Sequence, residues 1–391
     1  MKKHALLLSS FLLIGISSLQ AGISYNLSDF ETQNAGFSVG NVNQNGQNLF
    51  KIGASPDLTF GPLQVGLDIN AYIGGKPHSS LQPIVLRRIA YDHNRMAGIE
   101  WGRLQRVTYG QGLLMDNYDS GSRGSAELNN DQVGLKGYLD INNVRIDALN
   151  TASQVFAGRL SYTLSESFLM GSPIVFGGTY IKDQNGINET FQGATITRPK
   201  QEAWSADISL PIGGAFFTPY IEYAELTKGQ TGKGGSAGIK GDFTVATYKL
   251  EYRNLEAGFI PALFNDTYEA TSLDSANAPK EKTTGFLGAL SASLNDYIRG
   301  GIIYESYEHR DPILTGAIGW RKIGNITGVA NYTRSFTGKD NAILNSEILY
   351  STDNGLDYVV RLKRIYLQNG HEEDSYSVSL RFGFKALGLP F

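Results

Sequence analysis

The side chains of this chain that could take part in chemistry are charged residues placed at every second position of apolar segments. Lys51 lies between Phe50 and Ile52, and Asp68 lies between two large apolar residues in the same way. In an extended segment neighbouring side chains point to opposite faces, so the charges share one face and the apolar side chains share the other. The chemistry expected of such a face is electrostatic. The residues assigned to it are Lys51, Asp57, Asp68, Glu100, Lys136, Asp140, Arg145, Asp147, Glu222, Lys249, Glu251, Arg299, Glu305, Arg321, Glu347, Arg361, Lys363 and Arg381.

Other arrangements that carry chemistry are missing from the sequence. Cys is absent, which excludes disulfide and thiol chemistry. The histidines after residue 4 occur singly, without a His or Cys at metal-ligand spacing: His78, His93, His309 and His371. No combination of Ser, His and an acid suggests a nucleophile and its base. We therefore expect no metal, no cofactor and no enzymatic activity.

Two further groups of residues could be read as ligand sites. Asp116, Asn117 and Asp119 could collect calcium, but they lack the spacing of a calcium loop, so a polar loop is the better interpretation. Residues 110–112 and 232–236 are rich in glycine, yet neither segment completes a nucleotide-binding pattern. We interpret both as flexible loops.

The elements that position the charged face are predicted to be antiparallel strands. Residues 50–60 and 65–74 both alternate apolar with polar side chains, and Gly61-Pro62 turns the chain between them. An early strand is expected at residues 36–40. Further tight turns are predicted where Gly, Asn and Asp cluster, because hairpin turns need positive φ, at residues 92–95, 140–143, 211–214, 294–296, 323–325 and 352–355. Longer polar connections are predicted at residues 74–83, 107–130, 182–200, 226–236 and 270–282. This pattern predicts an all-β fold of about 18 strands, within a range of roughly 16–20.

The amino-terminal segment indicates export. Residues 1–21 combine Lys2 and Lys3, an apolar run and a small residue, Ala21, that suits a signal peptidase. After this signal peptide no apolar stretch approaches the roughly 20 residues that a membrane helix needs. A chain that spans a membrane with strands must close into a barrel, because hydrocarbon leaves an open sheet edge without partners. We therefore expect residues 22–34 to be a periplasmic tail or short plug, and residues 35–391 to form a single transmembrane antiparallel up-and-down β-barrel.

The carboxy-terminal alternation is the most regular in the chain. Its large apolar residues are Tyr376, Val378, Leu380, Phe382 and Phe384. Together with the signal peptide, the alternating strands and the Tyr-rich flanks, this pattern resembles Gram-negative outer-membrane β-barrels of the porin type. The resemblance implies that these five residues are the signal recognised for membrane insertion, although residues 385–391 follow them. It also implies an outer-membrane location, contact with outer-membrane lipid and lipopolysaccharide, assembly by the barrel assembly machinery, and room for a homo-oligomer. No nucleic-acid partner is expected.

One connection carries an apolar knot. Within residues 107–130, Leu113-Leu114-Met115 is flanked by Tyr109 and Tyr118, and a wholly solvated loop rarely has such a composition. The segment could fold into the lumen as a constriction, as the resemblance implies for one loop of many porins, or it could cover the rim or extend a strand. The candidates for a constriction are Tyr109, Gln111, Leu113, Leu114, Met115, Asp116 and Tyr118.

Two functions of different class fit this pattern. A barrel of this size is too wide for side chains alone to fill, which favours a water-filled pore whose wall carries the charged face. Its charges are nearly balanced, although Arg299, Arg321, Arg361, Lys363 and Arg381 gather in the last quarter of the chain. The first hypothesis is a channel for passive or weakly selective diffusion of small hydrophilic solutes. The alternative is a surface interaction or adhesion protein with an occluded lumen, but the connections are short for that role.

Overall fold

Every regular element of the described residues is a β-strand. A computed structural model of the chain describes residues 36–44, 47–74, 83–120, 133–169, 172–191, 194–213, 216–266, 268–269, 278–294, 297–308, 312–333, 342–352, 356–366 and 372–383. In these parts of the chain no helix has the length and apolar character needed to cross a membrane. The predictions for residues 1–21 and 22–34 lie outside the described residues.

The strands follow the chain in order. They are β1 (Gly36–Gln44), β2 (Gln47–Ser55), β3 (Asp57–Phe60), β4 (Leu63–Ile73), β5 (Ile84–His93), β6 (Ala97–Gly102), β7 (Val107–Tyr109), β8 (Met115–Tyr118), β9 (Gly134–Ile141), β10 (Val144–Thr151), β11 (Val155–Leu169), β12 (Ser172–Asp183), β13 (Ile187–Phe191), β14 (Ala194–Arg198), β15 (Glu202–Ser209), β16 (Thr218–Lys228), β17 (Gly232–Asp242), β18 (Ala246–Leu255), β19 (Thr283–Leu294), β20 (Ile298–Tyr307), β21 (Ile313–Ile323), β22 (Ile326–Thr333), β23 (Ile343–Ser351), β24 (Leu356–Tyr366) and β25 (Glu372–Gly383).

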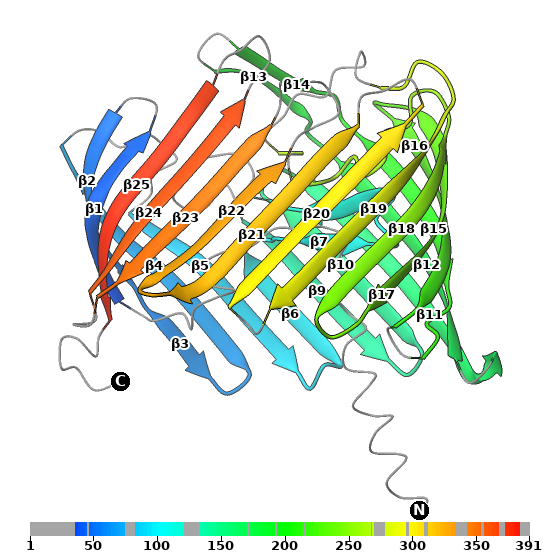
Figure 1. The fold of residues 1–391 in the computed structure, drawn as a ribbon, viewed down its shortest axis with the longest axis horizontal. Coiled ribbons are helices and arrows are strands. Elements are labelled where there is room, and N and C mark those ends of the chain that lie inside the picture. The colour runs from blue at the N-terminus through cyan, green and yellow to red at the C-terminus, as the bar shows by residue number, and fades with distance from the viewer. Residues whose placement is uncertain are drawn as a thin grey trace, which may run out of the picture.

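These strands form one closed antiparallel barrel (Figure 1). Wall strands pair in chain order, and β1 pairs with β25 from Gly36 opposite Gly383 onward, which leaves no open edge. Only the hairpins β7–β8 and β13–β14 stand apart as two-stranded sheets within the described residues. The described part of the large sheet has 21 strands, but β2 and β3 follow one another along β4, so 20 strands surround the lumen. The predicted range includes this number, whereas the central estimate of about 18 is too low.

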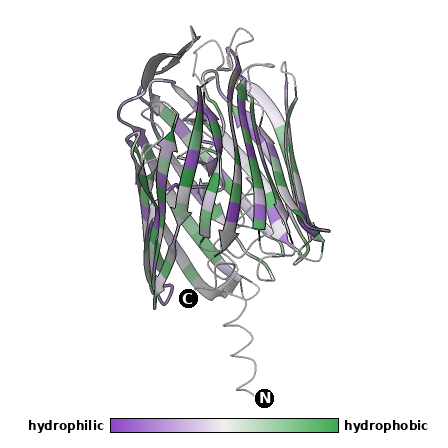
Figure 2. Cartoon of the chain, turned by 90° about the vertical axis from the view of Figure 1, so that its left-hand side faces the viewer, coloured by the Kyte–Doolittle hydropathy of each residue, from purple (hydrophilic) through white to green (hydrophobic). Residues whose placement is uncertain are grey.

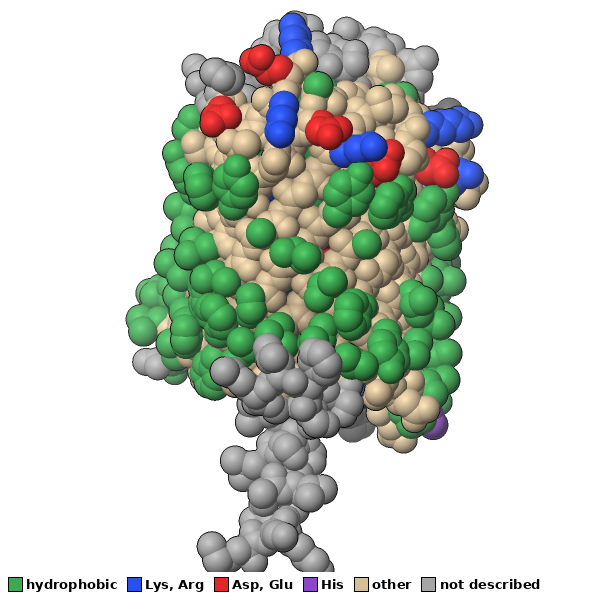
Figure 3. All heavy atoms as spheres, turned by 90° about the vertical axis from the view of Figure 1, so that its right-hand side faces the viewer, with side chains coloured by type: hydrophobic (Ala, Val, Ile, Leu, Met, Phe, Trp, Pro, Cys, Tyr) green, Lys and Arg blue, Asp and Glu red, His purple; other side chains and the backbone are tan. Residues whose placement is uncertain are grey.

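The two faces of the wall differ as the alternation predicts. On β16, Ile221 and Tyr223 are 55% and 41% exposed, whereas Glu222 between them is 2% exposed. Hydrophobic and hydrophilic residues alternate along the wall strands (Figure 2). On the face drawn in Figure 3, apolar side chains are spread over the sides and the lower half of the wall, and the charged ones gather near the upper rim. A closed barrel with an apolar exterior satisfies the backbone and presents hydrocarbon to lipid. The architecture confirms the predicted closed antiparallel β-barrel.

The barrel has one rim of short turns and one rim of longer connections, called here the turn rim and the loop rim. The strand bounds place all the predicted tight turns at the turn rim. The turn between β17 and β18 was not predicted, because Phe243-Thr244-Val245 lacks Gly and Asn. Thr244 has a φ of 68°, and its N–H donates to Asp242 Oδ1 at 2.9 Å. A side-chain oxygen thus stabilises a turn that glycine would ordinarily form.

The predicted loop at residues 226–236 is wrong. β16 continues to Lys228 and β17 starts at Gly232, so only residues 229–231 connect them. The glycine-rich segment is part of the wall, and a Cβ on Gly234 would lie 2.6 Å from the ring of Phe259. Glycine is present here because another segment of the chain packs against the inner wall, and not because the segment is a flexible loop.

Candidate functional site

The lumen contains a piece of chain that leaves the wall between β6 and β9. Residues 103–120, called here the luminal insert, include the β7–β8 hairpin. Leu113, Leu114, Met115 and Tyr118 are fully buried. The partners of the insert are wall residues that point away from the apolar exterior, such as Glu222. The structure therefore places this segment inside the barrel and not over its rim.

Polar contacts at the tip of the insert fix it to the wall. The N–H groups of Gln111 and Leu113 donate to Glu222 Oε2 at 3.1 Å and 2.9 Å. Gln111 Nε2 donates to Asp207 Oδ1 at 2.8 Å, and Lys249 Nζ donates to the Gln111 carbonyl at 2.7 Å. The tip thus contacts the carboxylate of Glu222 on β16, the carboxylate of Asp207 on β15 and the ammonium of Lys249 on β18.

The backbone conformation at the tip of the insert requires glycine. Gly110 and Gly112 have φ values of 69° and 91°, a region that favours glycine. A Cβ on Gly110 would collide with Glu222 Oε1. The glycine-rich segment 110–112 therefore has a fixed conformation that turns backbone N–H groups toward a carboxylate, in contrast to the flexible loop predicted from sequence.

A second segment packs on the insert from the connection between β18 and β19. The N–H of Ala262 donates to the Leu113 carbonyl at 2.8 Å, and the N–H of Phe264 donates to the Leu114 carbonyl at 3.0 Å. In return, the N–H of Asp116 donates to the Phe264 carbonyl at 3.0 Å. Residues 256–266 thus add an irregular partner segment to the luminal insert.

The two segments share an apolar cluster with one arc of the inner wall. Small wall residues make room for it at Ala157, Ala203 and Ala224, on β11, β15 and β16. The register places Ala224 opposite Gly234 and Gly234 opposite Leu255. The buried apolar members are Leu104, Val107, Tyr109, Leu113, Leu114, Met115, Tyr118, Leu149, Val155, Ala157, Ile181, Ala203, Ala224, Leu226, Leu255, Phe259, Ile260, Leu263, Phe264, Tyr268, Ala278 and Tyr307.

The arc of the inner wall that the insert covers also carries ion pairs, and the insert shields them from water. Arg159 Nη1 lies 2.6 Å from Asp207 Oδ2, and Lys249 Nζ lies 3.2 Å from Glu251 Oε2. Arg253 pairs with Glu251 and, at 2.9 Å, with Glu305 Oε2. Buried charges are tolerated only with such partners. The predicted residues Glu222, Lys249, Glu251 and Glu305 therefore meet in one network under the insert.

The opposite arc carries ion pairs that remain half-exposed. Arg361 lies 3.5 Å from Glu347, and their side chains are 30% and 29% exposed. Arg381 lies 3.4 Å from Asp357 on the neighbouring strand. These pairs are on β23, β24 and β25, whereas the tip of the insert contacts β15, β16 and β18; Arg103, at the base of the insert, is near enough to Glu347 for their charges to interact. Part of the accessible lumen therefore lies along this arc.

The remaining predicted charges fall into smaller groups. Glu100 pairs with Lys136 at 3.0 Å, and Arg145 pairs with Asp140 and Asp147. Arg87 lies 3.1 Å from Asp68 Oδ1. Lys51 and Lys363 are 8% and 5% exposed, and Arg299 and Arg321 are half-buried on β20 and β21. The side chain of Asp57 lies outside the described residues.

The cationic residues of the last quarter do not form one stripe. Arg299 and Arg321 lie on the adjacent strands β20 and β21, and Arg361, Lys363 and Arg381 lie on the adjacent strands β24 and β25. The strands β22 and β23 separate the two groups. The five residues therefore form two separate groups, one of Arg361, Lys363 and Arg381 and one of Arg299 and Arg321.

The predicted insertion signal lies largely on β25. Tyr376 and Val378 are 38% and 44% exposed on the outer face, and Leu380 shares their parity. Phe382 belongs to β25, but its side chain lies outside the described residues, as does Phe384 altogether. The recognition role of these residues stays a prediction.

Sequence reasoning missed two features of the insert. Arg103 and Asp119 form a bidentate ion pair across its base, with distances of 2.9 Å and 2.5 Å. Their spacing of sixteen residues gives no recognisable signal. Residues 256–269 were also missed as a luminal segment, although Phe259, Ile260, Leu263 and Phe264 are an apolar group in a connection and could have been noticed by the same reasoning as the knot at 113–115.

Burial changes the acidity of groups in the insert. It raises the pKa of the Asp116 carboxyl, against the opposing effects of Lys249 and of a hydrogen bond from Thr108 Oγ1 at 2.9 Å. Burial also raises the pKa of Tyr118, and the nearby Glu269 carboxylate adds to the effect. Among the described residues no group of three or more His, Cys, Asp or Glu is arranged to hold a metal ion.

Comparison with known proteins gives distant similarities of fold. No protein-family model and no curated protein sequence matches the chain. Wzi from Escherichia coli, a carbohydrate-binding β-barrel of the outer membrane involved in group 1 capsule assembly, is 11% identical over 90% of this chain and 85% of Wzi, with a TM-score of 0.38. The outer membrane protein OpdK from Pseudomonas aeruginosa is 10% identical over 89% of this chain and 97% of its own, with a TM-score of 0.37. OmpF from Salmonella typhi is 13% identical over 91% and 98%, with a TM-score of 0.29. These values are too low to say anything about function.

Proposed function

We propose that the protein is an outer-membrane channel through which small hydrophilic solutes diffuse along the arc of the lumen that the insert leaves uncovered. The observation that supports this proposal is the contrast between the two arcs. Side chains of the ion pairs under the insert are at most 16% exposed, whereas those of Arg361, Glu347, Arg381 and Asp357 are 19% to 30% exposed. Charges that stay hydrated in the lumen are expected where water and solutes pass.

We propose a weak preference for anions in this passage. On β23, β24 and β25 the half-exposed cations Arg361 and Arg381 face the half-exposed carboxylates of Glu347 and Asp357, and the buried ammonium of Lys363 adds one positive charge to the field of this arc. Most of these charges are paired, so the field that remains is small. A wall of this composition concentrates anions modestly at low ionic strength and loses the effect as salt screens it.

Planar-bilayer recording of the refolded protein tests this proposal. Discrete conductance steps are expected, with a reversal potential in a salt gradient displaced slightly toward that of the anion. A correctly folded protein that gives no steps would refute the channel and would favour the occluded surface protein. Heat-modifiable gel mobility establishes folding before either result is interpreted.

A further inference from the structure

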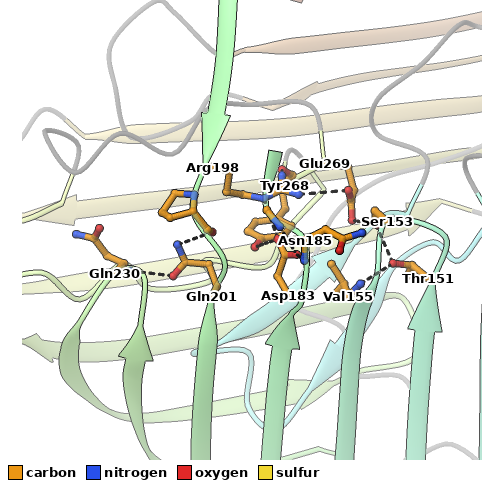
Figure 4. A network of polar contacts seen from close by, with 12 residues as sticks. Thr151, Ser153, Val155, Asp183, Asn185, Arg198, Gln201, Gln230, Tyr268 and Glu269 are labelled. Atoms are coloured by element: carbon orange, nitrogen blue, oxygen red, sulfur yellow. Dashed lines mark hydrogen bonds and ion pairs between the residues drawn. The ribbon is translucent and has the colours of Figure 1, made fainter. Parts of the chain in front are cut away.

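A buried ion-pair network at the loop rim joins connections that lie far apart in the sequence (Figure 4). Arg198, at the end of β14, has a side chain that is 1% exposed. Its Nε lies 3.2 Å from Asp183 Oδ2, and its Nη2 lies 3.5 Å from Glu269 Oε2. The guanidinium also stacks on the ring of Tyr268, with Cζ 3.8 Å from the ring centroid, and donates to the Tyr268 carbonyl.

The same network reaches the luminal insert. The Tyr118 hydroxyl, at the end of the β7–β8 hairpin, donates to Glu269 Oε1. Ser153 Oγ, from the turn between β10 and β11, donates to the same oxygen at 2.8 Å. The Tyr268 hydroxyl donates to Asp183 Oδ2 at 2.8 Å, which closes the circle back to Arg198. The Arg198 guanidinium on β14 thus lies at the centre of this network. It contacts Asp183 of the wall and Tyr268 and Glu269 of the connection between β18 and β19, and Glu269 links it to the insert.

The charge arrangement makes this network depend on Arg198. Two carboxylates, of Asp183 and Glu269, are almost fully buried and share one cation. Removal of that cation would leave two buried negative charges, and breaking a buried pair in this way is strongly unfavourable. The planar guanidinium can pair with both carboxylates and stack on Tyr268 at once, whereas a lysine ammonium is a single point charge.

We propose that Arg198 is a positioning residue that holds the luminal insert against the wall from the loop rim and so limits the free cross-section of the lumen. The inference rests on the proposed channel function. The tip of the insert is held by Glu222, Lys249 and backbone hydrogen bonds to residues 262–264, and its base is held by the Arg103–Asp119 pair. The loop-rim end of its hairpin is held by Tyr118 and its link to Arg198 through Glu269. Loss of Arg198 therefore releases the loop-rim end of the insert while the tip contacts remain.

Single-channel recording of Arg198→Met tests the proposal. The ratio of docked to released insert should fall by at least roughly a hundredfold and up to a few thousandfold, the change expected when a buried ion pair is broken. The recording should then show a larger conductance with frequent transitions between levels. The matched control is Arg364→Met, which removes an arginine at the same rim that pairs with Asp374 at 2.7 Å on the neighbouring wall strand. Conductance and noise equal to wild type in Arg198→Met would overturn the proposal.

A second readout does not depend on conductance. The chain has no cysteine, so Ser120→Cys introduces a single thiol at an insert position that is 5% exposed. A water-soluble maleimide should label this thiol slowly in the wild-type background and at least about tenfold faster with Arg198→Met, because the site opens only when the insert is released. Arg198→Lys should give an intermediate rate, since it restores the charge without the stacking. Equal labelling rates in all backgrounds would also refute the positioning role.

Milder variants serve if Arg198→Met does not fold. Tyr118→Phe removes only the hydroxyl that donates to Glu269, and it should raise the labelling rate by at least roughly tenfold, the lower end of the value of a hydrogen bond to a charged group. No change in labelling would overturn the proposal. A wild-type protein without conductance but with accelerated labelling in Tyr118→Phe would refute the channel and leave the positioning role in place.

Discussion

Replacing Glu222 by Gln should loosen the tip of the luminal insert. The Glu222 carboxylate is 2% exposed and accepts two backbone N–H groups, from Gln111 and Leu113, at 3.1 Å and 2.9 Å. Glutamine keeps the size of the side chain and removes its charge. The substitution therefore changes the strength of two hydrogen bonds with little change in packing.

The expected magnitude follows from those two bonds. A hydrogen bond to a charged group contributes about 1.5–3 kcal/mol, whereas a neutral one contributes about 1 kcal/mol. Loss of the charge should therefore cost about 1–4 kcal/mol over the two bonds, or roughly 5-fold to 900-fold in the ratio of docked to released insert. The substitution also removes the repulsion between the carboxylates of Glu222 and Asp207, which lie opposite each other on neighbouring strands, and this opposes the loss. Arg159 at 2.6 Å already compensates the charge of Asp207, so we expect the loss to dominate.

Single-channel recording at constant voltage measures this shift as the fraction of time spent at the larger conductance. Glu100→Gln is the matched control, because Glu100 pairs with Lys136 at 3.0 Å on a part of the wall away from the tip. The reasoning is refuted if Glu222→Gln gives wild-type kinetics, or if both substitutions change the kinetics equally.

Three further predictions concern the wall and the insert. Replacing Arg361, Lys363 and Arg381 together by Gln should shift the reversal potential toward cations, more at low than at high salt, and an unchanged potential in an open channel would mean that they do not line the path. Gly234→Leu should cost about 1–3 kcal/mol of stability through overpacking, because a Cβ would lie 2.6 Å from the Phe259 ring, and it should therefore lower the unfolding midpoint in detergent. Gly235→Leu is the control and should have little effect, because the nearest atom to its Cβ is 3.9 Å away. Burial raises the pKa of Asp116, so docking of the insert should be strongest in acid and should weaken as the pH rises above about 4, the ordinary pKa of an aspartate. Asp116→Asn should flatten this dependence of the open fraction on pH. A dependence of the opposite sign would contradict the assignment.

The barrel wall could be predicted from the sequence because its physical rule is local. A strand between water and lipid must alternate, so residues such as Ile221, Glu222 and Tyr223 show their faces without knowledge of the neighbouring strands. Most hairpin turns are equally local, since positive φ selects Gly, Asn or Asp. The turn at Phe243-Thr244-Val245 escapes this rule because Asp242 supplies the stabilising oxygen from the strand before it.

The contents of the lumen could be predicted only in part, because they depend on contacts across the fold. The knot at Leu113-Leu114-Met115 indicated burial but not its partner. That partner, residues 256–269, lies about 150 residues further along the chain and joins the insert through backbone hydrogen bonds that any sequence could make. The glycines of β17 were misread for the same reason, because the ring that requires Gly234 belongs to this distant segment.

The position of the insert also changes what the charges of the lumen mean. Along the sequence the signs nearly cancel, which suggests a neutral pore. In space, Arg159, Asp207, Glu251 and Arg253 are paired and covered by the insert, so no passing solute meets them. The charges left to act on a solute include those of the uncovered arc, where Arg361, Lys363 and Arg381 face the carboxylates of Glu347 and Asp357 on β23, β24 and β25. Selectivity in this barrel should therefore depend on which arc is covered, and a variant that releases the insert should change ion preference as well as conductance.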